Sequence, residues 1–90
     1  MQTDTNVPEP MGAQSFLFEG HLNGASFAEF ARHRAARLDL ALAIETHTDR
    51  AVRLSVDGEP DLIDMFEMAM SLGPHDCIVL DITRLTEQPA

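Results

Sequence analysis

A glycine-punctuated loop at 20–27 is the stretch of this sequence best suited to chemistry. It reads G-H-L-N-G-A-S-F and runs directly into a predicted helix. Main-chain N–H groups in such a loop, together with the positive end of the helix dipole, form a ready cradle for an anion. The first helical turn, however, carries no Lys or Arg to neutralise a bound phosphate. The pattern indicates an anion cradle without its cation, built from Gly20, His21, Leu22, Asn23, Gly24, Ala25, Ser26 and Phe27.

Two histidines would come near the mouth of this cradle, and together they could begin a metal site or supply a base near neutral pH. They are His21 in the loop and His47 beside Thr46. Adjacent strand residues point to opposite faces, so His47 is expected to point away if Thr46 faces the site. Cys77 is the single cysteine and is expected to be a small buried hydrophobe. We therefore expect surface histidines, no metal site and no cofactor.

The charge of the chain restricts its partners. The net charge is -9, and all six basic residues besides histidine are arginines. Such a chain repels nucleic acid and anionic lipid, so neither is an expected partner. The start of the sequence has no basic and apolar signal-peptide pattern, and no apolar run is long enough to span a bilayer. We expect a cytoplasmic protein.

Periodicity divides the chain into a leader, one domain and a tail. Residues 1–14 are polar and without periodicity, and we expect a disordered leader there. The domain is predicted for 15–86, and 87–90 form a loose tail. Its first strand is expected from Ser15 to about Gly20, and the first helix from a capping box of Ser26 and Glu29 to about Leu38. A hairpin, a second helix ending at Gly73 and a last strand follow.

The resulting β-α-β-β-α-β order predicts an α+β, ferredoxin-like fold. Two helices should cover one face of a four-stranded antiparallel sheet and leave the other face open. Each helix carries an apolar stripe at helical spacing. The first stripe comprises Phe27, Phe30, Ala31, Ala35 and Leu38; the second comprises Leu62, Ile63, Phe66, Ala69, Met70 and Leu72, with Met65 and Met68 toward its edge.

With these elements in place, the chain from Ser15 to Leu85 resembles the acylphosphatase family. G-H-L-N-G-A-S-F is similar to the family's signature loop Gly-x-Val-Gln-Gly-Val-Gly-Phe, and A-A-R-L-D-L, V-D-G-E and L-G-P extend the match. The resemblance implies the same fold and an activity of acyl phosphate hydrolysis. In the family, an Arg directly after the signature Phe grips the phosphate, and an Asn on the second strand positions the attacking water.

Both family side chains are replaced in this sequence. Ala28 stands at the position of the Arg, Thr46 at that of the Asn, and Ser26 at that of the second loop glycine. Arg32 lies one turn after Ala28 and could reach back as a substitute cation. Its alternative role is that of a surface residue paired with Glu29.

Three functions fit this pattern. The first is a catalytically inactive acylphosphatase-like protein that keeps the cradle and acts as a small binding or interaction domain. It would take a small anion in the loop, or a protein partner through the open sheet face or an edge strand. The second is a weak or altered acylphosphatase in which Arg32 and Thr46 replace the missing pair. The third is a ligand-sensing or dimerising ferredoxin-like domain.

Overall fold

A computed structural model describes residues 12–85 of the chain. Their β-α-β-β-α-β order confirms the predicted ferredoxin-like α+β fold. Most of the predicted leader (1–11) and the whole predicted tail (87–90) lie outside the described residues. The elements are β2 (Gly12–His21), α1 (Gly24–Arg37), β3 (Ala41–His47), β4 (Ala51–Gly58), α2 (Pro60–Leu72) and β5 (Ile78–Leu85).

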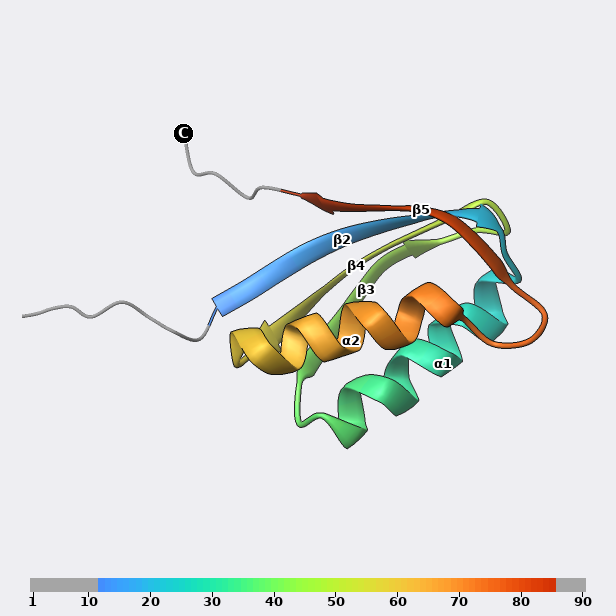
Figure 1. The fold of residues 1–90 in the computed structure, drawn as a ribbon. Coiled ribbons are helices and arrows are strands. Elements are labelled where there is room, and N and C mark those ends of the chain that lie inside the picture. The colour runs from blue at the N-terminus through green and yellow to red at the C-terminus, as the bar shows by residue number, and fades with distance from the viewer. Residues whose placement is uncertain (1–11, 86–90) are drawn as a thin grey trace, which may run out of the picture.

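The four strands form one antiparallel sheet in the order β3-β4-β2-β5. Both helices lie on the same face of this sheet and run side by side (Figure 1). α1 packs on β3 and β4, whereas α2 packs on β4 and β5. The opposite face has no covering layer among residues 12–85, and β3 and β5 are the two edge strands.

Four phenylalanines at the centre of the core join the sheet to both helices. Alternation along β2 turns Phe16 and Phe18 toward the helices, and their rings stack at 5.6 Å between centroids. Phe27 of α1 lies 5.2 Å from the Phe18 ring, and Phe66 of α2 lies 6.2 Å from the Phe16 ring. Aromatic pairs at such separations are favourable beyond the area that they bury. The contacts fix the start of α1 above the end of β2.

β2 begins three residues earlier than predicted. Gly12 pairs with Gly58 and Ala13 with Asp57, so the antiparallel ladder with β4 runs to the end of that strand. The sequence pattern missed residues 12–14 because Gly, Ala and Gln carry little apolar periodicity. Their place in the sheet comes from the backbone pairing alone.

α2 buries a narrower stripe than predicted. Ile63, Phe66 and Met70 are buried, but Leu72 is 78% exposed, which contradicts its expected place in the core. Two residues beyond Met70 is roughly 200° further around the helix, so Leu72 points to solvent. Met65 and Met68 are exposed as well, rather than at the edge of the core. Gly73 ends the helix with a φ of 66°, as expected for a glycine stop.

Neither helix among the described residues has the length and apolar character needed to cross a membrane.

Candidate functional site

The loop that the sequence identified connects β2 to α1, and its helix start differs from the predicted capping box. α1 begins at Gly24, and its N-cap is Asn23, whose Oδ1 accepts from the Ser26 N–H at 3.2 Å. The Phe27 N–H donates to the Asn23 carbonyl at 2.8 Å. Asn is as good an N-cap as Ser, and here it lies one turn earlier. The Ser26 and Glu29 capping box is therefore wrong, and both side chains have other partners.

The turn between β3 and β4 closes one side of the loop. The main-chain N–H of Gly24 donates to Asp49 Oδ1 at 3.0 Å, and that of Leu22 donates to the Asp49 carbonyl at 2.8 Å. The Gly20 N–H donates to the Arg50 carbonyl at 3.0 Å. A carboxylate of the chain itself thus accepts from the first helical N–H, where an anion held at a helix N-terminus would bind.

The connection between α2 and β5 supplies a second carboxylate on the other side. The Ser26 hydroxyl donates to Asp76 Oδ1 at 2.9 Å, and the Asn23 side-chain amide donates to Asp76 Oδ2 at 3.3 Å. The hydrogen bond from Ser26 is the main reason that the pKa of Asp76 lies below its ordinary value. Asp76 is therefore ionised at neutral pH and lies beside the positive end of the α1 dipole.

The Cys77 thiol fills the space beneath the helix start. The N–H of Asn23 donates to Cys77 Sγ at 3.3 Å, and the thiol is buried. Burial raises the pKa of Cys77, with the carboxylate of Asp76 adding to this effect. A protonated, buried thiol is a poor nucleophile. Cys77 is thus the small packing residue that the sequence predicts.

Together these contacts leave the cradle largely occupied from within. The N–H groups of Leu22, Asn23, Gly24, Ser26 and Phe27 all donate to acceptors of the chain. Two carboxylates at the mouth already complement the helix dipole, and they would repel an incoming phosphate. A ligand anion would have to displace Asp49 from Gly24 and overcome this repulsion.

Ala28 leaves no open position for a guanidinium. Its side chain is only 2% exposed and belongs to the buried face of α1. An Arg at this position would have to push between the helix and the sheet, or force the loop to rearrange. The residue at position 28 therefore supplies no cation to the loop.

A β-bulge near the end of β3 reverses the expected directions of Thr46 and His47. Ile44 pairs with Leu54, but the register then shifts, so that Thr46 pairs with Arg53 and His47 with Val52. Arg53 is exposed whereas Val52 is buried beneath the helices. The pairing therefore places Thr46 on the open face of the sheet and His47 on the helix face. The alternation assumed from sequence fails here because a bulge adds one residue to a strand.

His47 lies directly against the start of α1. A Cβ placed on Gly24 would come within 3.2 Å of His47 Nδ1 and 2.9 Å of the Thr48 carbonyl oxygen. Gly24 is buried, so only a residue without a side chain fits between the loop and the hairpin. The second glycine of the loop is therefore a packing requirement of this chain.

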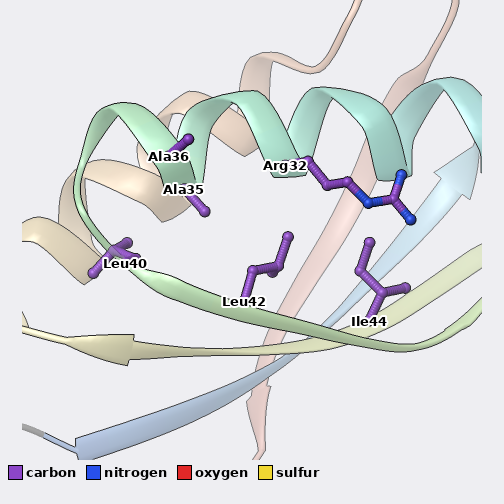
Figure 2. Close-up of a pocket in the computed structure, with 6 residues that line it drawn as sticks. All are labelled: Arg32, Ala35, Ala36, Leu40, Leu42 and Ile44. Atoms are coloured by element: carbon purple, nitrogen blue, oxygen red, sulfur yellow. The ribbon is translucent and has the colours of Figure 1, made fainter.

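Arg32 lies on the flank of α1 that faces β3. Its Nη1 atom is 3.3 Å from Glu29 Oε1, which agrees with the surface role expected as the alternative. The side chain leans toward the N-terminal part of the helix, and the guanidinium lies above Ile44 (Figure 2). It lines a groove between α1 and β3 of about 340 Å³.

The remaining histidines are exposed. His21 and His75 lie at the surface, and His33 Nε2 is 3.2 Å from Glu29 Oε2. Within residues 12–85, no three His, Cys, Asp or Glu side chains lie close enough to hold a metal ion together.

Sequence reasoning did not identify Asp49 and Asp76 as part of this site. Both occur in turn segments, T-D-R and P-H-D-C, where acidic residues are common and carry no specific signal. The predicted topology did contain a clue. In an antiparallel β-α-β-β-α-β unit, the β3–β4 turn and the α2–β5 connection lie at the same end of the sheet as the start of α1.

Comparison with proteins of known name identifies the relatives of this chain. No protein-family model matches it. A protein named acylphosphatase from Nitratidesulfovibrio vulgaris strain DP4 is 33% identical over 64 residues, 71% of this chain and 64% of the relative. Another acylphosphatase, from Salinibacter ruber, is 34% identical over 56 residues, 62% of this chain and 59% of the relative. The chain is similar in sequence to the acylphosphatases over this region. The matched region spans about three fifths of the length of these curated acylphosphatases.

Solved structures of acylphosphatases share the fold. The acylphosphatase of Bacillus subtilis superposes with a TM-score of 0.75 at 20% identity, covering 88% of each chain. An acylphosphatase from Coxiella burnetii gives the same TM-score and identity, covering 90% of this chain and 87% of that one. At this identity the likeness concerns the fold, and it agrees with the sheet and helix arrangement described above.

Proposed function

We propose that this chain is an acylphosphatase-like protein that does not hydrolyse acyl phosphates and serves as a small binding domain. Acceptors of the chain itself take up most main-chain N–H donors of the loop. The observation that carries the proposal is the hydrogen bond from the Gly24 N–H to the Asp49 carboxylate at 3.0 Å.

The two replaced side chains support the same conclusion. Ala28 stands where the family resemblance places the phosphate-gripping Arg, and Thr46 where it places the water-positioning Asn. A guanidinium contributes charge-assisted hydrogen bonds to a phosphoryl group whose transition state is stabilised mainly by positioning and electrostatics. Its loss costs on the order of 3 to 5 kcal/mol, or ~10²- to 10³-fold or more in rate. Thr46 pairs with Arg53 and therefore lies on the open face of the sheet, opposite to the face that carries α1 and its loop.

A binding role leaves two kinds of surface available. One is the open face of the sheet, where Ala43, Ser55 and Leu85 lie in one row across the strands with the buried Ser15. The other is the free backbone edge of β3 or β5, which can pair with an extended segment of a partner protein.

A second candidate function is a weak acylphosphatase. The names of the curated relatives favour it. In this case Arg32 would supply the cation after leaving Glu29, a surface pair of small energetic value. Thr46 would need a different strand register to reach the loop.

Hydrolysis of benzoyl phosphate separates the two candidates. We expect the unmodified protein to hydrolyse it at the uncatalysed rate. The combined variant Ala28→Arg and Asp49→Ala supplies a cation and frees the Gly24 donor, so turnover should rise above background. Circular dichroism must show that this variant is folded, because position 28 is buried.

The matched control carries Asp57→Ala in place of Asp49→Ala. Asp57 is an exposed aspartate at the far end of β4, so the control makes the same charge change away from the loop. Turnover by the unmodified protein at a rate typical of an enzyme, abolished by Arg32→Ala, would overturn the proposal in favour of the second candidate.

A further inference from the structure

We infer that the groove between α1 and β3 binds an amphipathic anion, a short apolar chain that ends in a carboxylate. The groove has a volume of about 340 Å³, within the range of small-molecule sites. It lies between α1 and the edge strand β3 (Figure 2). Its lining residues are Arg32, Ala35, Ala36, Leu40, Leu42 and Ile44.

The side chains that line the groove from β3 and the residue before it are apolar. Alternation along β3 turns Leu42 and Ile44 toward α1, and Leu40 precedes them at the same spacing. On the helix side, Ala35 and Ala36 have no side-chain bulk to fill the space above these residues. Because β3 is an edge strand, no further strand within residues 12–85 closes the groove from the side. The groove suits a linear hydrocarbon chain better than a wide ring system.

The cation Arg32 lies at the Ile44 end of the groove. Arg32 is the only charged residue among the lining residues, and its guanidinium lies above Ile44 (Figure 2). Its contact with Glu29 is long, at 3.3 Å, and the side chain remains 56% exposed. Glu29 also pairs with His33 at 3.2 Å, so it is shared between two partners. The guanidinium therefore has donors available for a ligand.

The charge distribution selects the ligand class. A neutral apolar molecule would leave the cation unused, and a cationic amphiphile would be repelled by it. A carboxylate matches the planar fork of a guanidinium and brings a single negative charge. A phosphate monoester brings close to two charges into a chain whose net charge is already -9, so a carboxylate head is favoured.

This inference gives a ligand to the binding role proposed above and rests on that role, but it concerns a different site. Its test reads binding directly and does not depend on hydrolysis. The ligand inference and the proposed lack of hydrolysis can therefore fail separately. If the protein does not bind the probe and hydrolysis stays at background, only the ligand inference is wrong. If it binds the probe and also hydrolyses acyl phosphate at an enzymatic rate, only the proposed lack of hydrolysis is wrong.

The probe is sodium octanoate, titrated into ¹⁵N-labelled protein and followed by NMR. We expect saturable shifts of the Ala35, Ala36, Leu42 and Ile44 amides, with a Kd on the order of 0.1 to 1 mM. Arg32→Gln should weaken binding about tenfold, since it removes a charge-assisted contact. Glu29→Gln should tighten binding, because it removes the competing carboxylate.

Two further variants separate recognition from folding. Ala36→Leu fills the groove at an exposed helical position with another strong helix former, so the fold should persist while binding is lost. Arg37→Gln makes the same charge change as Arg32→Gln on the same helix, outside the groove, and should bind as the unmodified protein does.

Several outcomes would overturn the inference. They are the absence of saturable shifts up to the solubility limit of octanoate, and unchanged binding in both Arg32→Gln and Ala36→Leu. Equal affinity for 1-octanol would show that the cation takes no part. Tighter binding of octyl phosphate than of octanoate would refute the choice of a carboxylate.

Discussion

Asp49 Oδ1 accepts a hydrogen bond from the main-chain N–H of Gly24 at 3.0 Å, which joins the β3–β4 turn to the first residue of α1. The acceptor is a carboxylate and the donor is an otherwise free N–H at the positive end of a helix. The chain thus supplies its own anion to a loop whose form suits a foreign one.

Removing the internal carboxylate should open the loop to phosphate. Asp49→Ala leaves the Gly24 donor unpaired, so the free energy of unfolding should fall by about 1 kcal/mol. Phosphate should then raise the Tm of this variant and leave that of the unmodified protein almost unchanged. The measurement is a thermal melt in phosphate and in chloride at equal ionic strength, with Asp57→Ala as the control. An equal phosphate response in the unmodified protein would show that Asp49 does not occupy the anion position.

Gly24→Ala should destabilise the protein through a backbone clash. The added Cβ would lie 2.9 Å from the Thr48 carbonyl oxygen, which cannot move without disturbing the hairpin. We expect a loss of about 1 to 3 kcal/mol in urea unfolding, despite the better helix propensity of alanine. Ala25→Ser, one residue further on and exposed, is the control and should change the free energy of unfolding by a few tenths of a kcal/mol. A Gly24→Ala protein as stable as the parent would mean that the loop is free to move away from the hairpin.

The Asp76 carboxylate should make the loop sensitive to acid. Its pKa lies below the ordinary value of 3.8, mainly because Ser26 donates to it. A carboxyl whose pKa is lowered on folding contributes stability above its ordinary pKa, and this contribution is lost as the pH falls through the lowered value. In Ser26→Ala, NMR titration should show the Asp76 midpoint moving upward, and the acid-dependent part of the stability should shrink.

Ser71→Ala is the matched control for this titration, because the Ser71 hydroxyl donates to the Met68 carbonyl and not to Asp76. It should leave the Asp76 midpoint in place. The same midpoint in Ser26→Ala and in the unmodified protein would refute the role of the hydroxyl.

Arg84 should contribute more to stability than other surface arginines. Its guanidinium contacts Glu67 at 2.6 Å and Asp64 at 2.8 Å, and lies 5.1 Å from the centre of the Phe16 ring. It therefore joins α2, β5 and the edge of the core. Arg84→Gln should cost about 0.5 to 1.5 kcal/mol, whereas Arg53→Gln, which breaks one exposed pair with Glu45, should cost less than about 0.5 kcal/mol. Urea unfolding measures both free energies. Equal losses of stability would show that the contacts of Arg84 contribute no more than an ordinary surface ion pair.

The apolar residues near the end of α2 should differ sharply in their importance. Met70 is fully buried, so Met70→Ala should cost about 2 to 5 kcal/mol. Leu72 is exposed, so Leu72→Ala should stay within about 0.5 kcal/mol. Each substitution replaces a large apolar side chain of α2 by alanine, so the two variants are controls for each other. A large loss of stability in Leu72→Ala would show that Leu72 packs in the core, as its sequence spacing predicted.

The sequence by itself determined the fold class and the place of the loop. Alternation along the strands, the helical stripes and the glycine at 73 are local signals, and each acts over a few residues. They sufficed for the element order and for the burial of Phe27 and Phe66. The family resemblance likewise rests on contiguous motifs, and the acylphosphatase relatives confirm it.

Only the tertiary structure decided which groups meet at the loop. Asp49 and Asp76 are 25 and 52 residues from Gly24 along the chain, and no local pattern connects them to it. The bulge in β3 depends on pairing with β4, so the direction of His47 could not be read from alternation. The choice of Asn23 over Ser26 as the N-cap followed from the partner available to each side chain, because Asp76 takes the Ser26 hydroxyl. Hydrogen bonds between distant segments form only once the sheet has brought their ends together, and at this loop they join Gly24 to Asp49 and Ser26 to Asp76.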